Sequence, residues 1–366
     1  MTAPARHACS AIPGRGTPLA PPNRFERLHL EPDPDADSCP EDEAPLPRTQ
    51  FYDDSSESIL NPVDSPDVPI SMGLNPYRGC EHGCAYCFAR PTHDYLGWNA
   101  GLAFETRIMV KRRAPDLLRA ALSTSRWSPR TISMSGVTDC YQPAERRFRI
   151  TRGCLEVLAE FRNPVTIITK NALITRDLDV LASLARHRCV MVYLSVTTLD
   201  ATLAGKLEPR AARPEHRLRT IRALADAGVP VGVMAAPVIP GLTDTELPAI
   251  LAAAADAGAC TAGYTLLRLP YAVKDVFLQW LDDHAPEKKA RILSRLESLR
   301  GGRLNSSAWG DRMQGQGVFA QQLRDLFHIT ARRAGLDGGG PELTTEHFRR
   351  PGGVQLELFP RESAGA

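Results

Sequence analysis

The chain has 366 residues, of which 43% are hydrophobic and 23% charged, so it is long and apolar enough to bury one large core or two smaller ones. No run of 18 apolar residues occurs, which excludes a transmembrane helix, and the first residues lack the basic and apolar regions of a secretory signal. Nine cysteines are too few for a disulfide scaffold. We therefore expect a cytoplasmic protein whose clustered cysteines serve a metal or catalysis.

The net charge of +2 is distributed unevenly along the chain. Residues 1–66 hold five Arg and twelve Asp or Glu, a net charge of −7, so the remaining residues carry +9. Only six of the 44 basic residues are Lys, and Arg suits the recognition of phosphate and carboxylate groups. A coding preference for Arg explains the same bias, and the basic body is compatible with nucleic acid without requiring it.

The N-terminal part of the chain reads as a Pro- and acid-rich extension, residues 1–66. It contains 12 of the 30 Pro and few aromatic residues, with an acidic stretch from Glu31 to Glu43. Such a segment buries too little apolar surface to offset the entropy lost on ordering. We predict disorder to about residue 50, followed by an extended lead-in over 51–69.

Short apolar runs then alternate with segments of helical periodicity, which predicts an α/β fold. The predicted strands are 71–75, 131–135, 165–169, 190–196, 231–236 and 260–267. The helices between them are predicted at 114–125, 145–162, 176–186, 214–227 and 246–258. Nearly uninterrupted apolar strands indicate a parallel sheet covered on both faces. Six units are fewer than a full eight-fold barrel, so a partial barrel or an open doubly wound sheet fits, and either places chemistry at the carboxyl ends of the strands.

The region after the last predicted strand changes character twice. Helical periodicity continues over 272–284, 286–300 and 316–334. From residue 338 the chain is rich in Gly and Pro. We therefore divide the chain into the extension (1–66), a core (67–270), a helical C-terminal region (271–335) and a flexible tail (336–366).

A compact cysteine motif follows the first predicted strand, with the spacing C-x3-C-x2-C: Cys80, Cys84 and Cys87. Thiolates are soft ligands that select iron–sulfur clusters, Zn²⁺ or Cu⁺. Gly79 and Gly83 give the backbone the freedom to wrap three sulfurs around one group. Three ligands leave one corner of a cubane open, whereas a structural zinc site needs four. The alternatives are a zinc site completed by His82 or a distant cysteine, and a redox-sensing or merely buried group of thiols.

The stretch from Asn75 to His93 resembles the radical S-adenosylmethionine (SAM) superfamily, and within it uncharacterised bacterial members of the branch related to spore photoproduct lyase. The resemblance implies a partial (β/α)6 barrel and a [4Fe–4S] cluster held by the three cysteines, with SAM chelating the fourth iron. It also implies an electron donor of the flavodoxin or ferredoxin type. One electron then cleaves SAM to methionine and a 5′-deoxyadenosyl radical, which abstracts a hydrogen atom from the substrate.

Further cofactor-binding residues are carried over from this resemblance. Tyr86 stands where the superfamily places an aromatic residue near the adenine, with ordinary packing as the alternative. The superfamily often has Gly-Gly-Glu after the second strand, and here only Gly136 and Asp139 correspond to it. Ser135 and Thr138 are candidates beside them, and an N-cap role for Thr138 or Asp139 is the alternative.

The next strand ends supply three more candidates. Lys170 follows the third strand, where the lyase-like branch uses a Lys for the SAM carboxylate, and a Lys inside a barrel mouth needs an anionic partner. Ser195 is expected to hydrogen-bond the ribose or the SAM carboxylate. Gly241 allows a close backbone approach to the adenine. Glu208 and Arg210 either line the pocket or belong to a solvated loop.

Cys140 is the candidate catalytic residue. The lyase uses a cysteine beside its second strand to return a hydrogen atom to the product radical, and Cys140 lies a few residues beyond the corresponding position. A small buried thiol is the commoner reason for a cysteine in a core.

The tail contains a pentapeptide, Gln355 to Phe359, that resembles the peptide by which bacterial replication and repair proteins bind the sliding clamp. In this interpretation Leu358 and Phe359 fill an apolar pocket, and the Gly/Pro-rich stretch acts as a tether. A terminal strand or coil packed on the body is the alternative.

The sequence therefore favours a radical SAM enzyme of lyase type acting on DNA, for example in repair, with DNA and the clamp as partners and no membrane association. A radical SAM enzyme that modifies RNA, protein or a small molecule is the first alternative. A non-enzymatic nucleic-acid-binding protein that carries zinc or a cluster is the second.

Overall fold

The computed structural model describes residues 12–26, 47–68 and 70–351. Its main sheet has seven strands in the spatial order β10-β9-β8-β7-β6-β3-β2. Six of them pair in parallel, and only β2 is antiparallel to its neighbour. The strands are β2 (Leu60–Pro62), β3 (Met72–Leu74), β6 (Ile132–Met134), β7 (Val165–Thr169), β8 (Val190–Ser195), β9 (Val231–Val238) and β10 (Thr261–Leu266).

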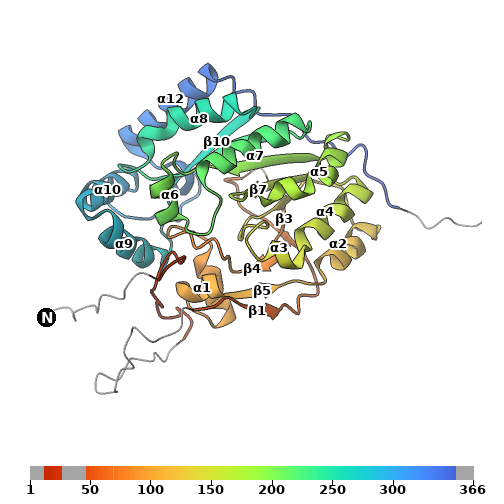
Figure 1. Cartoon of the computed structure of the whole chain (residues 1–366), viewed down its shortest axis with the longest axis horizontal. Coiled ribbons are helices and arrows are strands. Elements are labelled where there is room, and N and C mark those ends of the chain that lie inside the picture. Colours follow the sequence, from red (N-terminus) through yellow and green to blue (C-terminus); the bar gives the residue numbers. More distant parts are fainter. Residues whose placement is uncertain (1–11, 27–46, 69, 352–366) are drawn as a thin grey trace, which may run out of the picture.

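The six parallel strands follow chain order without a reversal, which is the order of a barrel and not of a doubly wound sheet. The predicted partial (β/α)6 fold is thus confirmed. Helices surround the outside of the sheet (Figure 1). Those between the strands are α2 (Ala114–Ser123), α3 (Glu145–Phe148), α4 (Ile150–Phe161), α5 (Leu178–Ala185), α6 (Ala201–Leu207), α7 (Pro214–Asp226) and α8 (Leu247–Asp256).

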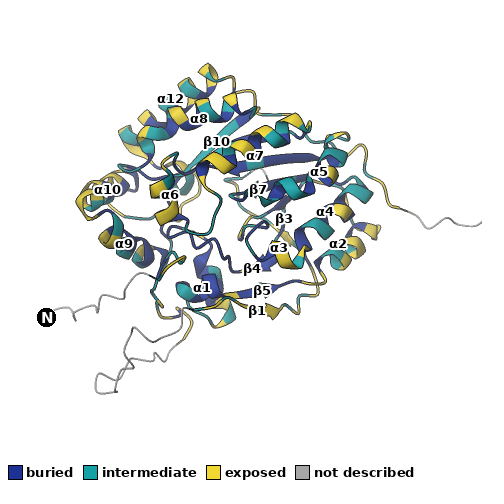
Figure 2. Ribbon diagram, viewed as in Figure 1, coloured by how far each residue is buried: buried dark blue, intermediate teal, exposed yellow. Residues whose placement is uncertain are grey.

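Burial explains why these apolar runs become strands. The central strands are buried along most of their length, while the helices expose one face to solvent (Figure 2). Side chains such as Ile167, Val192 and Val233 have no exposed surface. Each buried aliphatic side chain of this size contributes about 1.5–3 kcal/mol, and summed over the sheet this drives the arrangement.

The segment predicted as one helix over 145–162 forms two helices, α3 and α4. Arg149 between them adopts a left-handed conformation, with φ of +53°. The Glu145 carboxylate accepts hydrogen bonds from the backbone N–H groups of Thr151 (3.0 Å) and Arg152 (3.3 Å). These groups begin α4, so the carboxylate satisfies donors that a continuous helix would have used internally.

A second, three-stranded sheet was not expected from the sequence. It has the order β1-β5-β4 and consists of β1 (Gln50–Asp53), β5 (Arg107–Val110) and β4 (Tyr77–Arg78). Its strands have two to four residues, too short for a hydrophobic period. The shorter elements η2 (Arg90–Leu96), α1 (Leu102–Thr106), η3 (Ala172–Asp177) and η4 (Asp244–Glu246) were missed for the same reason.

The predicted disorder up to about residue 50 is wrong for the described residues 12–26 and 47–50, which pack on the core. The segment predicted as an extended lead-in is extended in part, since it contains β2 and most of β1. The buried Asn23 amide donates to the carbonyl of Asp94 (2.8 Å), and Ile59 is 1% exposed. Hydrogen bonds hold much of this segment, which a count of apolar residues does not reveal. The rest of the prediction, at 1–11 and 27–46, lies outside the described residues.

The helical C-terminal region is confirmed. It contains α9 (Val273–His284), α10 (Pro286–Leu299), α11 (Asp311–Gln314) and α12 (Gly317–Arg333). Phe277 and Trp280 of α9 are stacked and buried, with ring centroids 5.8 Å apart. No helix in the described part of the chain is both long and apolar enough to cross a membrane.

The first part of the predicted flexible tail is instead packed on the body. Residues 336–350 run past the amino ends of the strands: Leu336 accepts from the N–H of Ala262 (3.2 Å). Further along, the N–H of Thr344 donates to Arg188 (3.1 Å) and that of Arg349 to Phe161 (2.9 Å). The expected clamp peptide, 355–359, lies outside the described residues.

Candidate active site

The cysteine loop lies between β4 and η2, and its geometry depends on two glycines. Gly79 and Gly83 have φ of +81° and +68°. A Cβ at Gly83 would lie 2.8 Å from the Glu105 carboxylate, so both the backbone conformation and the space require glycine. The loop thereby carries three cysteines that are free thiols: Cys80, Cys84 and Cys87.

The three thiols fit a shared iron–sulfur group. Cys80 and Cys84 are buried and Cys87 is partly buried. Burial raises the pKa of the Cys80 thiol well above its ordinary value, and the neighbouring charges of Asp139, Cys84 and Cys87 raise it further. Cys87 packs against both the cluster that contains Cys84 and the cluster that contains Cys80, so the three side chains are neighbours. A cationic group between them would relieve the repulsion of their thiolates.

The buried ion pair between Arg90 and Glu105 supports the cysteine loop. Arg90 donates to the carbonyl of Cys84 through Nε (3.0 Å) and Nη2 (2.8 Å), and to that of Gly101 through Nη1 (2.9 Å). Its Nη2 also lies 2.5 Å from Glu105, and neither side chain is exposed. Sequence reasoning missed both residues, although Arg90 falls within the stretch that carries the resemblance.

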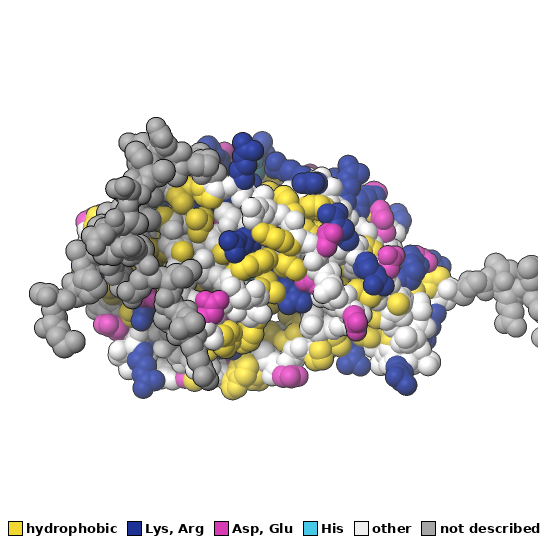
Figure 3. Space-filling view, turned by 90° about the horizontal axis from the view of Figure 1, so that it is seen from below, with side chains coloured by type: hydrophobic (Ala, Val, Ile, Leu, Met, Phe, Trp, Pro, Cys, Tyr) yellow, Lys and Arg dark blue, Asp and Glu magenta, His cyan; other side chains and the backbone are white. Residues whose placement is uncertain are grey.

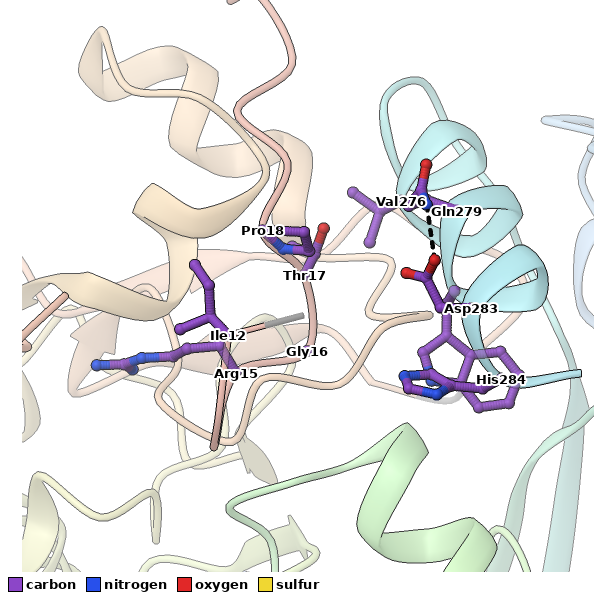
Figure 4. A pocket seen from close by; sticks show the side chains of 10 residues that line it. Ile12, Arg15, Gly16, Thr17, Pro18, Val276, Gln279, Asp283 and His284 are labelled. Atoms are coloured by element: carbon purple, nitrogen blue, oxygen red, sulfur yellow. Dashed lines mark hydrogen bonds between the residues drawn. The ribbon is translucent and has the colours of Figure 1, made fainter. Parts of the chain in front are cut away.

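Residues 12–26, here called the N-terminal strap, lie over the same loop. The N–H of Gly16 donates to Glu105 Oε2 (3.0 Å), and a Cβ on Gly16 would lie only 1.6 Å from the carbonyl oxygen of Gly83. Arg15 extends away from α9 and donates to the carbonyl of Glu105 (3.0 Å), while Thr17 and Pro18 face that helix (Figure 4). A cavity of about 20 Å³ remains there, room for about one water. The N-terminal strap therefore contacts both the cysteine loop and α9, and it helps to hold the loop in place.

His82 is the candidate fourth ligand of the alternative zinc site, but both of its ring nitrogens have partners in the protein. Nδ1 lies 3.4 Å from Asp139, and Nε2 lies 3.1 Å from the amide nitrogen of Asn171. Burial lowers the pKa of His82, so the ring is neutral, donates through Nδ1 and accepts through Nε2. Among the described residues, no three His, Cys, Asp or Glu side chains are arranged to hold a single metal ion.

Four side chains meet at the carboxyl ends of β7 and β8. Lys170 donates to the carbonyl of Ala236 (3.0 Å), lies 3.7 Å from Glu208 and sits 5.8 Å from the centre of the Tyr86 ring. The Tyr86 hydroxyl lies 3.1 Å from that of Thr197 and donates to Glu208. The structure thus brings Tyr86 and Lys170 together, while their expected roles at the adenine and at the SAM carboxylate stay predictions.

Glu208 is the centre of this network, a role that the sequence left open. It pairs with the buried Arg217 and accepts from Thr197 (2.7 Å). Burial alone would raise the pKa of Glu208, but Arg217 and Lys170 outweigh it and lower the pKa to about 2. A permanent carboxylate therefore lies 3.7 Å from the Lys170 ammonium. The ammonium has three donors and uses one of them for the carbonyl of Ala236, so it can also bind an anionic group.

Asp139 ties the end of β6 to β7. Its carboxylate accepts from the Thr169 hydroxyl (2.8 Å) and from the backbone N–H groups of Lys170 (2.8 Å) and Tyr141 (2.9 Å). With His82 as a further neighbour, it joins two strand ends to the cysteine loop. This is a positioning arrangement, and the α3 N-cap is Ala144 rather than Asp139.

The other candidates after β6 differ in their burial and in their hydrogen bonds. Ser135 has φ of +80°, and its hydroxyl accepts from the N–H of Cys140 (2.9 Å). The Thr138 hydroxyl donates to the carbonyl of Tyr77 (3.1 Å), whereas Gly136 is exposed. Cys140 packs in the hydrophobic core with no exposed surface, and burial raises the pKa of its thiol.

The last two candidates lie at the ends of β8 and β9. Ser195 is buried, and its carbonyl accepts from Arg217 (2.8 Å). Gly241 has φ of +80°, and its carbonyl accepts from Arg291 of α10 (2.7 Å). Ile239, which the sequence reasoning did not select, packs in the same cluster as Cys84 and Tyr86.

Comparison with known proteins agrees with this geometry. The Radical SAM superfamily model matches residues 74–254. The chain is 37% identical over 244 residues to an uncharacterized protein of Mycobacterium tuberculosis, covering 66% of this chain and 72% of the relative. It is 28% identical over 190 residues to an uncharacterized protein of Methanocaldococcus jannaschii, covering 51% and 67%.

Among solved structures, the chain resembles a spore photoproduct lyase mutant with bound AdoMet and dinucleoside spore photoproduct. The TM-score is 0.56 at 16% identity, over 77% of this chain and 79% of that one, which shows a shared fold.

The fold and the motif together define an enzyme of the radical SAM class. The chain belongs to the radical SAM superfamily, with a fold like that of spore photoproduct lyase, and its cofactors are a [4Fe–4S] cluster and SAM. The non-enzymatic alternative is therefore not retained.

Proposed function

We propose that the protein is a radical SAM enzyme that acts on DNA, with its cluster bound by Cys80, Cys84 and Cys87. When bound, the cluster supplies the electron that cleaves SAM and yields the 5′-deoxyadenosyl radical. The observation that carries the proposed SAM site is that Tyr86 of the cysteine loop lies 5.8 Å from Lys170 at the strand ends.

The chain's own residues prepare this site. Lys170 supplies a positive charge for the SAM carboxylate, and the carbonyl of Ala236 holds the ammonium in place. Tyr86 cannot rotate freely because its hydroxyl is bonded to Thr197 and Glu208. The strap and the loop support keep water from the buried thiols.

Two features favour a nucleic-acid substrate. The chain beyond the N-terminal extension carries a net charge of +9, mostly from Arg. Lys and Arg side chains lie along the upper margin of the face in Figure 3, between hydrophobic ones. The fold is also like that of a lyase solved with a dinucleoside photoproduct. We accordingly propose that the enzyme takes part in DNA repair.

The test is product analysis of the anaerobically reconstituted protein with SAM, reductant and damaged or undamaged DNA. We expect 5′-deoxyadenosine, released faster with damaged DNA than without it. Cys84→Ala should lose the cluster and SAM cleavage, while Cys189→Ala, at a thiol bonded to the Arg162 carbonyl (3.2 Å), should keep both. SAM cleavage that responds to RNA, peptide or metabolites instead of DNA would contradict the proposed substrate.

The partners and the location belong to the same proposal. We expect a flavodoxin- or ferredoxin-type protein to reduce the cluster, and the sliding clamp to bind Gln355–Phe359. A clamp pull-down with and without residues 355–359 tests the second partner, and equal capture of both forms would remove it. All seven described cysteines are free, which suits a cytoplasmic enzyme.

A further inference from the structure

A cleft of about 430 Å³ opens between α3 and the loop that leads into α7. Its lining includes no acidic side chain and four basic ones: Arg146, Arg210, Arg213 and His216. Cavities of about 300–1,000 Å³ are of the size that holds a small organic ligand or a nucleotide. The cleft is therefore a concave, basic site outside the network at the strand ends.

Much of this positive charge is not neutralised within the protein. Arg146 and Arg213 are exposed, and among the described residues neither forms an ion pair with a carboxylate. Arg210 is paired with Glu81 (3.1 Å). The nearby carboxylates are already engaged, since Glu145 pairs with Arg176 and Glu208 with Arg217. Glu215 is exposed in the first turn of α7 but does not line the cleft.

The cleft adjoins the reaction site directly. Asn171 lines it, follows Lys170 in sequence, and contacts His82 of the cysteine loop (3.1 Å). Two other lining residues are bonded to the same part of the protein: the N–H of Ala212 donates to the carbonyl of Lys170 (3.3 Å), and that of Arg210 to the carbonyl of His82 (3.2 Å). The lining of the cleft is thus hydrogen-bonded to the backbone of Lys170 and to the cysteine loop, where SAM and the cluster are proposed to bind.

We propose that this cleft binds the phosphodiester backbone of the substrate strand, next to the nucleotide that enters the barrel mouth. The inference rests on the proposed function in taking the substrate to be DNA. One guanidinium group can donate to two phosphate oxygens at once. Such contacts with the backbone fix the register of a nucleic acid without reading its sequence. An acidic electron carrier would be drawn by the same charge, but protein partners bind broad surfaces, whereas this site is a concavity of nucleotide size.

The test measures binding of a fluorescein-labelled single strand of about 12 nucleotides to the full-length, cluster-loaded protein over a range of salt. The double variant Arg146→Gln/Arg213→Gln removes two cleft charges. Its matched control, Arg303→Gln/Arg333→Gln, removes two exposed charges from the C-terminal region. We expect the cleft variant to bind about tenfold more weakly, with the salt dependence reduced by about 1.4 in log–log slope, and the control to match the wild type.

The outcomes separate the cleft from the substrate. If wild type, cleft variant and control all bind alike, the cleft assignment is wrong, while DNA-dependent SAM cleavage by the wild type would still support the proposed function. If the wild type binds no oligonucleotide, both proposals fall. If the cleft variant keeps its DNA affinity but is reduced more slowly by flavodoxin, and normally by dithionite, the cleft binds the electron donor and our assignment is overturned. Equal iron content and circular dichroism confirm that the variants are folded and loaded.

Discussion

Arg90 and Glu105 form an ion pair with no exposed side-chain surface, and the same guanidinium holds the carbonyl of Cys84 through two hydrogen bonds. The pair connects the cysteine loop to α1, and Gly16 of the N-terminal strap bonds the same carboxylate. A second such pair, Arg217 with Glu208, lies at the strand ends. One buried ion pair therefore supports the cysteine loop, and another supports the network at the strand ends.

Glu105→Gln should destabilise the protein by about 3–5 kcal/mol, because it leaves the buried Arg90 without a counter-charge. Urea unfolding of the protein without its cluster measures this directly. The matched control is Arg119→Ala, at an exposed pair with Glu160, which should change the unfolding free energy by about 1 kcal/mol or less. Equal losses in the two variants would show that the buried pair has no special role.

Gly16→Val should release the N-terminal strap, because even a Cβ would overlap the carbonyl of Gly83. We expect lower iron content after reconstitution and faster loss of the cluster to a chelator, with the helical circular dichroism unchanged. Ala20→Val, at an exposed position of the same strap, is the control. Cluster retention equal in the two variants would mean that the strap does not support the loop.

Lys170→Ala should weaken SAM binding by about tenfold to a hundredfold, the worth of a hydrogen bond to a charged group. Equilibrium binding of SAM to the reconstituted protein gives the dissociation constant. Lys206→Ala, an exposed residue of α6, should bind SAM normally. If Lys170→Ala retains wild-type affinity, the SAM carboxylate has another partner.

The ionised Glu208 should make the free energy of unfolding fall as the pH is lowered. Its pKa in the folded protein is about 2, below the ordinary value of 4.5, so its contribution is present above pH 4.5 and is lost as the pH falls towards 2. That difference corresponds to about 3 kcal/mol. Unfolding measured between pH 7 and pH 3 should show a shallower acid dependence for Glu208→Gln than for the wild type, although the variant is less stable at pH 7. Parallel curves would contradict the depressed pKa.

The sequence predicted the barrel well because its strands are continuous apolar runs. The bounds of β7 were predicted as they stand, and those of β6, β8 and β10 to within one residue at either end. The cysteine loop was predicted because its ligands are close in sequence. Lys170 and Tyr86 were selected through resemblance, and the structure places them together.

The supporting residues could not be predicted in the same way. Glu105 and Arg90 have ordinary sequence surroundings, and only the fold shows that both side chains are buried together. Gly16 lies in a segment whose composition indicates disorder, and its role depends on contact with Gly83, 67 positions along the chain. Such contacts leave no local pattern, so they are visible only when the chain is folded.

Residues 336–350 lie at the end of the barrel opposite the cysteine loop. Arg350 donates to the carbonyls of Thr124 (3.1 Å) and Trp127 (2.8 Å), before β6, so the described chain ends at the floor of the barrel. The cysteine loop and Lys170 lie at the opposite rim. Residues 336–350 therefore close off the amino ends of the strands and do not cover the opposite rim, where a substrate strand would enter.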